Sequence, residues 1–332
     1  MKKKGISQDY WGYIFLIPFF LVYFVFSMWP LIQTFIFAFK EYYVDTGSIS
    51  IFSKGDRIVD NGFCALGNFK AVMGSDGEFF RTLKNTVVVW LLGFIPQIIL
   101  SLLLAVWFTD LRLKIKAQGF FKTVIYLPNV IMASAISLLF FLLFTKGGAL
   151  YQIMQTKEGE SLLTTVWGMR GIIGFINFIM WYDNTTILLM AAIMGIDPSL
   201  YESSQIDGAN PTQTFWKITI PHIKPILSFV LITSMIGGLQ TYDVPALLAG
   251  DFGNPKGSVK TLVMVIQTGK DSNIGQTAAV SVLIFIISAV LGFIAFNTMN
   301  ERPVKKKKKN QKLVSAYPTA KKQQSSSRPA KG

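Results

Sequence analysis

The chain alternates long apolar stretches with shorter polar ones, and this pattern sets its fold class. Six apolar stretches each approach the ~20 residues that a helix needs to cross a bilayer. They lie at residues 11–38, 86–109, 121–144, 172–194, 225–247 and 276–298. The pattern predicts an all-α integral membrane protein with six transmembrane helices. The first stretch is too long for a signal peptide and lacks a small-residue cleavage site, so we expect an uncleaved anchor.

The polar segment between the fourth and fifth apolar stretches carries strong helix signals. Ser199 with Glu202 three residues later makes a capping-box pattern. Asp197 followed by Pro198 is the competing helix start, because proline is favoured at the first helical position. Either start predicts a short helix inside a loop at residues 197–224.

A second set of signals in this loop predicts a second helix. Gly208 is placed to end the first helix in a left-handed conformation. Asn210 followed by Pro211 is a new N-cap with proline at the first helical position. Pro221 is expected to close this second helix. An ordinary connection does not need two punctuated helices, so the loop is predicted to be a docking element.

The loop resembles the EAA loop of permease subunits of binding-protein-dependent ABC importers, whose pattern is E-A-A-x3-G-x9-I-x-L-P. Every spacing is kept, and the matching residues are Glu202, Ser203, Ser204, Gly208, Ile218, Ile220 and Pro221. Two serines replace the alanines and Ile220 replaces leucine, all small-for-small or isosteric changes. The stretch from Leu66 to Phe69 also resembles the segment that precedes the second span in sugar-type permeases.

This resemblance covers about residues 11–300 and implies a six-span permease domain with a cytoplasmic two-helix coupling loop. The systems it points to import maltose, glycerol phosphate or multiple sugars into bacteria. It implies a second permease subunit as heterodimer partner, two ABC ATPase subunits inside, and an extracytoplasmic solute-binding protein. ATP and Mg would then bind the ATPase subunits, and no cofactor would bind this chain.

The resemblance also assigns roles within the loop. Its first helix would lie in a groove of the ATPase and present Leu200, Ser203, Ser204 and Asp207 on one face. Glu202 would pair with a basic residue of the ATPase, or would serve only as a capping carboxylate at the helix start. The full set of coupling residues is Leu200, Glu202, Ser203, Ser204, Asp207, Gly208, Ile218 and Pro221.

Polar side chains at membrane depth are the expected substrate contacts. Asp183 lies roughly 20 Å from a cytoplasmic boundary near Ile196, where a carboxylate is costly unless it faces a cavity or a partner. The predicted substrate pathway comprises Asn177, Trp181, Tyr182, Asp183, Asn184, Gln240, Tyr242 and Asp243. Aromatic faces with amide and carboxylate groups suit a sugar. In the alternative, Trp181 and Tyr182 are interfacial belt residues and Asp183 pairs with the partner permease.

The charge distribution predicts the orientation. The net charge is +14, and residues 301–332 hold eleven basic residues against one acidic residue. This composition predicts a disordered cytoplasmic tail near anionic lipid. Basic runs after a last span usually fix orientation, so nucleic acid is not an expected partner. We therefore expect a multi-pass protein of the bacterial cell membrane, with the N-terminal residues 1–10 and the tail both cytoplasmic.

Motifs for catalysis or metal binding are missing from the sequence. It has no phosphate-binding loop, no nucleophile elbow and no paired-histidine zinc motif. Cys64 and His222 are the only residues of their types, so no metal site and no enzymatic activity are expected.

Two other classes of protein remain open. A secondary transporter or channel would work without an ATPase, and a membrane enzyme is a weaker rival. Within the importer family, a polyol or a sugar phosphate competes with a neutral oligosaccharide as substrate. The fourth and fifth spans carry no cation apart from Lys224 at the edge, which favours the neutral sugar.

Overall fold

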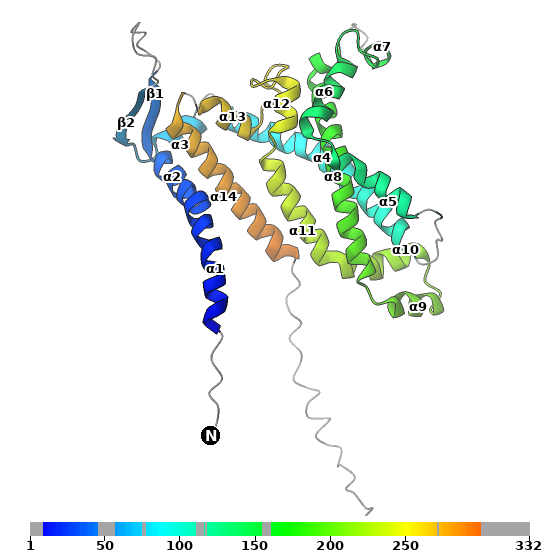
Figure 1. Cartoon of the computed structure of the whole chain (residues 1–332). Coiled ribbons are helices and arrows are strands. Elements are labelled where there is room, and N and C mark those ends of the chain that lie inside the picture. Colours follow the sequence, from blue (N-terminus) through cyan, green and yellow to red (C-terminus); the bar gives the residue numbers. More distant parts are fainter. Residues whose placement is uncertain are drawn as a thin grey trace, which may run out of the picture. The chain divides into compact units, whose positions relative to one another are not determined.

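The computed structural model of the protein describes residues 9–45, 57–74, 78–110, 116, 118–154, 161–270 and 272–299. The predicted basic tail at 301–332 and residues 1–8 of the predicted N-terminal segment lie outside the described residues. Within the described part the chain is predominantly helical (Figure 1).

Five helical stretches among the described residues are long and apolar enough to cross a membrane. They are Gly12–Ala38, Glu78–Thr109, Val166–Met194, Pro211–Ala249 and Ile274–Asn297. A sixth crossing would consist of a bent pair, Gly119–Val130 with Ala133–Phe144, whose halves meet at 87°. The prediction of a multi-span helical membrane protein is confirmed, and the described spans number five, or six with the bent pair.

The first and last spans pack together. The first consists of α1 (Asp9–Tyr23), the π-helical segment η1 (Phe24–Met28) and α2 (Trp29–Ala38) in unbroken succession. α2 packs against α14 (Ile274–Met299), as Figure 1 shows. Ala278 and Ala279 on α14 are buried in this contact. Their small side chains let the two helices approach closely in lipid.

A two-stranded antiparallel sheet follows the first span, so the all-α prediction is wrong in this detail. Its strands are β1 (Lys40–Asp45) and β2 (Arg57–Phe63). Both are rich in aromatic and β-branched residues, which suit a pleated surface. The ammonium group of Lys40 lies 2.7 Å from the carboxylate of Asp60. This hydrogen bond and a second from the backbone of Gly62 lower the pKa of Asp60 below its ordinary value.

The second and fourth spans form the most extensive helix pair. α3 (Gly67–Met73) precedes α4 (Glu78–Thr109), which packs along α8 (Val166–Met194). A Cβ added to Gly174 would lie 2.7 Å from the Cβ of Leu92, so the two backbones approach closely at this point.

The third span predicted at 121–144 is broken near its middle. It consists of α5 (Gln118–Tyr126), the 3₁₀ turn η2 (Leu127–Val130) and α6 (Ala133–Phe144). Pro128 cannot donate a backbone hydrogen bond, and Met132 has an extended backbone with ψ 144°. The helix therefore stops and restarts at a new angle. Two short elements follow, α7 (Tyr151–Met154) and η3 (Leu162–Thr164).

The predicted coupling loop contains one separate helix and the start of a longer one. The separate helix is α9 (Pro198–Ile206), and α10 (Pro211–Thr214) continues through the π-helical segment η4 (Phe215–Thr219) into α11 (Ile220–Leu239). The prediction that Pro221 closes the second helix is therefore wrong. Pro221 lies in the first turn of α11, directly after the wider turn of η4. In this position a helix tolerates the missing N–H and the fixed φ of proline.

The fifth span is interrupted towards its other end. α11 stops at Leu239, and α12 (Asp243–Ala249) begins after a short break. A loop then leads to α13 (Leu262–Gly269) and on to α14. Figure 1 shows α9 and α10 at one end of the helices and α12, α13 and the β hairpin at the other.

Candidate functional site

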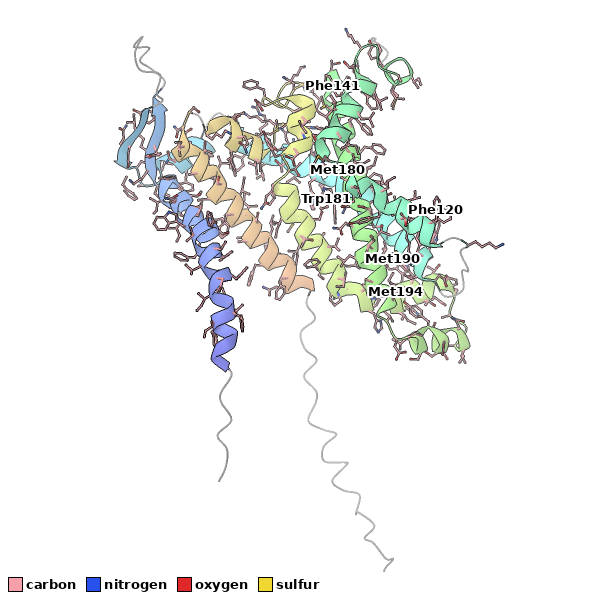
Figure 2. All side chains as sticks on the ribbon, viewed as in Figure 1. Phe120, Phe141, Met180, Trp181, Met190 and Met194 are labelled. Carbon is pink, nitrogen blue, oxygen red and sulfur yellow. The ribbon has the colours of Figure 1, made fainter. Side chains whose placement is uncertain are left out.

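A cavity of about 460 Å³, lined by both polar and apolar side chains, lies between α4, α8 and the broken fifth span. Its volume is in the range typical of small-molecule sites. The side chains of Met180 and Trp181 reach it from the middle stretch of α8, whereas Met190 and Met194 lie nearer the end that leads into α9 (Figure 2). The cavity therefore occupies the depth at which substrate contacts were predicted.

Six of the eight predicted pathway residues line this cavity. They are Asn177, Trp181, Asn184, Gln240, Tyr242 and Asp243. The three on α8 are spaced by four and three residues, which places them on one helical face. Gln240 and Tyr242 lie in the break between α11 and α12, and Asp243 is the first residue of α12. Residues more than fifty positions apart in sequence are thus brought to one wall.

Tyr182 and Asp183 do not line the cavity, because their side chains point about 100° and about 200° around the helix from that of Trp181. The hydroxyl of Tyr182 donates to the carbonyl of Ile125 at 3.3 Å, and so ties α8 to α5. Asp183 is fully buried, and neither of its carboxylate oxygens has a hydrogen-bond partner of good geometry. Its electrostatic neighbours include the amide groups of Asn129 at the break of the third span. Direct sugar contact therefore does not fit their positions in this structure.

The cavity also contains polar and aromatic residues that sequence reasoning missed. Trp90 and Phe94 stack with ring centroids 5.2 Å apart, and the indole N–H of Trp90 donates to Ser234 at 3.1 Å. Gln97 donates to the hydroxyl of Thr185 at 2.8 Å. Gln97 carried a usable signal, since it is a lone amide inside an apolar span.

Gly238 lets the Trp90 ring reach its position. A Cβ on Gly238 would lie 2.2 Å from the Cδ1 atom of Trp90. The indole therefore packs on bare backbone of α11, and its aromatic face becomes part of the cavity wall. The sequence showed only a flexible glycine pair at this point.

At the far end of α8, the coupling loop has well-defined helix ends. Oδ1 of Asp197 accepts the backbone N–H of Ser199 at 2.9 Å, so the Asp197-Pro198 start forms rather than the capping box of Ser199 and Glu202. This hydrogen bond lowers the pKa of Asp197 below its ordinary value.

The turn after α9 is a left-handed helix terminus, as predicted. Gly208 has φ 75°, and its N–H donates to Gln205 at 3.1 Å. The N–H of Ala209 reaches back to Ser204 at 2.9 Å. These two bonds satisfy the last carbonyls of α9, and the positive φ favours glycine. Asn210 then caps α10 through a reciprocal pair of hydrogen bonds with Gln213, which confirms the predicted second start.

The outward face of the loop differs from the predicted one at a single position. Leu200, Ser203 and Asp207 are exposed, whereas Ser204 is only 7% exposed and donates to the carbonyl of Tyr201. Glu202, Gly208 and Pro221 are also exposed and Ile218 is half-buried. Two large apolar side chains missed by the sequence reasoning are exposed beside them: Ile206 is 86% exposed and Trp216 is 62% exposed.

No group of three or more histidine, cysteine, aspartate or glutamate residues that could hold a metal ion exists in the part of the chain that the structure describes. Cys64 is half-buried and free, and His222 is exposed, with Nδ1 2.6 Å from the carbonyl of Ile218.

Comparison with known proteins places this arrangement in a family. The model of the binding-protein-dependent transport system inner membrane component matches residues 87–306. The chain belongs to this family. It is thus a transport component, and not an enzyme.

Several curated relatives match this inner membrane component over nearly its whole length. The multiple sugar-binding transport system permease protein MsmF of Streptococcus mutans is 28% identical over 89% of this chain and 97% of its own length. The lactose transport system permease protein LacF of Rhizobium radiobacter is 29% identical over 88% of this chain and 94% of its own. The arabinooligosaccharides transport system permease protein AraP of Bacillus subtilis is 27% identical, with 85% and 86% covered.

Solved structures share the fold. A chain of a bacterial ABC transporter involved in the import of the acidic polysaccharide alginate matches with a TM-score of 0.67 and 22% identity, covering 89% of this chain and 96% of that chain. The same kind of transporter, in complex with an alginate pentasaccharide-bound periplasmic protein, matches with a TM-score of 0.60.

Proposed function

We propose that the chain is the transmembrane permease subunit of an ATP-driven sugar importer and forms half of its translocation pathway. The observation that carries the proposal is the cavity of about 460 Å³ at the level of the break in the fifth span. Relatives that bear the names of sugar transport permeases, over more than four-fifths of this chain, support the substrate class.

The chemistry of the cavity wall suits a neutral oligosaccharide. The side-chain amides of Asn177, Asn184 and Gln240 suit the hydroxyl groups of a sugar, and Gln97, whose amide N–H groups donate to Trp181 and Thr185, adds its carbonyl oxygen. The aromatic residues of the wall suit the C–H side of a sugar ring, and they are Trp90, Phe94, Trp181, Phe229 and Tyr242. Among the described residues that line the cavity, none is cationic and Asp243 alone is acidic. A uronate or sugar phosphate would find no countercharge on this wall.

The coupling role of the loop at 197–224 is also a proposal. α9 projects beyond the ends of the spans (Figure 1), and its exposed face carries Leu200, Ser203 and Ile206. An exposed apolar stripe with a small residue in it suits a helix lying in a groove of an ATPase. Closure of the ATPases would move the docked loops and switch the cavity between outward and inward access.

The remaining partners follow from this assignment. A second permease subunit would complete the cavity, an extracytoplasmic solute-binding protein would deliver the sugar, and two ATPase subunits would dock from the cytoplasm. Both termini and the coupling loop would then face the cytoplasm of a bacterial cell.

Reconstitution with the co-encoded partners tests the transport function. The chain, the second permease, the ATPase and the binding protein are placed in liposomes, and uptake of neutral and acidic oligosaccharides is measured with and without ATP. We expect ATP-dependent uptake of a neutral sugar and none of a uronate. Uptake by the chain alone, without ATPase, would instead establish the secondary transporter.

A matched pair of variants tests the coupling surface. Ser203→Trp places a bulky ring on the exposed face of α9, and should reduce ATPase co-purification at least tenfold. Ser203→Ala keeps a small side chain and should retain the ATPase fully. Equal recovery with both variants would remove this face from the interface.

A further inference from the structure

A network of partly buried polar groups, centred on the buried Asn85, holds the loop after α12 against two spans. The side-chain amide of Asn85 on α4 donates to the carbonyls of Gly257 at 2.9 Å and Lys260 at 3.3 Å. Arg170 on α8 donates through Nε and Nη2 to the carbonyl of Ser258 at 3.1 and 3.0 Å. A further bond of 2.8 Å from Arg170 to the amide oxygen of Asn85 closes the network.

The strength of this network comes from its burial and from the shape of guanidinium. Asn85 is only 3% exposed, so its amide would be costly to leave unpaired. The planar fork of Arg170 grips one carbonyl with two N–H groups, and its guanidinium lies 5.2 Å from the ring centroid of Trp167. Lys260 adds an ion pair of 2.7 Å with Glu78. We call Asn85 and Arg170 the outer clamp.

The clamped loop connects directly to the cavity wall. Thr261, the residue after the clamped segment, is fully buried and donates its hydroxyl to the carbonyl of Thr241 at 2.8 Å. Thr241 lies in the break between α11 and α12, where a carbonyl lacks its helical partner. Its neighbours Gln240 and Tyr242 line the cavity. The next backbone N–H, of Leu262, donates to the hydroxyl of Thr86 on α4 at 3.1 Å.

We propose that Thr261, held by the outer clamp, is a positioning residue that sets where Gln240 to Asp243 stand in the cavity. The physical reason is that the carbonyl of Thr241 has no helical donor, because the residue four positions on is Pro245, which lacks an N–H. The hydroxyl of Thr261 takes the place of that donor. The selectivity of the cavity is then set partly from residues that do not touch the solute. The effect on transport selectivity rests on the proposed function. The positioning of Gln240 to Asp243 by Thr261 does not depend on the proposed function.

Cysteine labelling tests the positioning without any transport assay. In the complete importer, with Cys64→Ser removing the native thiol, Gln240→Cys reports on the broken segment. Thr233→Cys reports on the same cavity from the intact part of α11. The rate of reaction with a small maleimide is measured for both, in backgrounds of Thr261→Val and Thr261→Ser.

We expect Thr261→Val to change the labelling rate at position 240 by about threefold to tenfold, as the loss of one hydrogen bond implies. Position 233 should not respond, and Thr261→Ser should behave as the wild type because it keeps the hydroxyl. Arg170→Lys, which keeps the charge but loses the fork, should shift position 240 in the same direction. This variant decides the question if Thr261→Val does not accumulate in the membrane.

Transport then tests the consequence. The ratio of uptake rates for two neutral oligosaccharides of different length should change at least threefold in Thr261→Val and remain unchanged in Thr261→Ser. A purely structural role would lower both rates equally. Unchanged labelling at position 240 in both Thr261→Val and Arg170→Lys would overturn the inference. Absent sugar uptake in the wild type, with the labelling change present, would count against the proposed function alone.

Discussion

Two nearby residues on α8 show how strongly a change of helical face alters the surroundings of a side chain. Trp181 is 53% exposed and faces the cavity, whereas Asp183 two positions later is fully buried. A rotation of 100° per residue places them on different sides of the helix. Membrane depth alone predicted the same role for both, and the rotation separates them.

The cap of α9 gives a prediction with a pH dependence. Because folding lowers the pKa of Asp197, its contribution to stability is present above its ordinary pKa of about 3.9 and is lost as the pH falls through the lower folded value. Asp197→Asn keeps the acceptor oxygen and should keep α9 protected from hydrogen exchange at neutral pH. Asp197→Ala should exchange faster across Pro198–Ile206. Equal exchange in the two variants would show that the cap contributes nothing.

Gly238 gives a second prediction at this scale. Alanine there would place a Cβ 2.2 Å from the Trp90 ring, and overpacking of this kind costs about 1–3 kcal/mol. Alanine at Gly237 meets no atom within 4 Å, so it serves as the matched control. The measurement is the thermal unfolding midpoint of the purified complex in detergent. A larger loss for Gly237→Ala than for Gly238→Ala would contradict the prediction.

At the scale of elements, two of the spans are broken and one loop helix is continuous with its span. The third span bends by 87°, and the fifth is interrupted after Leu239. Both breaks contribute residues to the cavity, Ala133 from the third and Gln240 to Asp243 from the fifth. Irregular backbone at membrane depth is tolerated where it is buried in protein or lines a water-filled cavity, and the breaks lie beside the cavity.

The helical connection from α10 through η4 into α11 predicts a mechanical role. Replacing Ile218 and Thr219 together with glycine should loosen this connection, since each glycine costs a helix about 1 kcal/mol. We expect the ATPase still to co-purify while ATP-driven uptake falls at least tenfold. The matched control is the double alanine variant, which keeps helix propensity and should keep most uptake. Undiminished uptake in the double glycine variant would show that motion does not pass through η4.

At the scale of the whole molecule, the polar elements separate to two ends of the apolar helices. The coupling loop lies at one end, and the clamped loop after α12 lies at the other (Figure 1). Across a bilayer, we expect this separation to place the coupling loop on the cytoplasmic side and the clamped loop on the outside. The basic tail, at residues 301–332, is expected on the same side as the coupling loop.

Accessibility in intact cells tests this orientation. In the Cys64→Ser background, Phe252→Cys, whose parent side chain is 72% exposed, should react with a membrane-impermeant maleimide from outside. Ile206→Cys, whose parent side chain is 86% exposed, should react only after the cells are permeabilised. The opposite pattern would invert the topology.

Sequence alone determined the features that depend on local physics. Apolar stretches of bilayer length fixed the membrane class, and Gly208 and Asn210 fixed the turn of the coupling loop through backbone conformation and capping. The sequence reasoning did not predict the β hairpin, because its two strands are short and pair only with each other. The prediction that Pro221 ends a helix was wrong because a proline can also stand in the first turn of a helix.

Only the tertiary structure decided which residues meet. The hydrophobic periodicity of α8 did not predict which of its faces lines the cavity. A span surrounded by protein and lipid is apolar on most sides, so its faces differ little in sequence. The outer clamp joins Asn85, Arg170 and a loop almost ninety residues further on, and no local signal links them. Helix propensity and the length of an apolar stretch can be determined from neighbouring residues in the sequence. The partners of a buried polar group depend on how helices that are distant in sequence pack together.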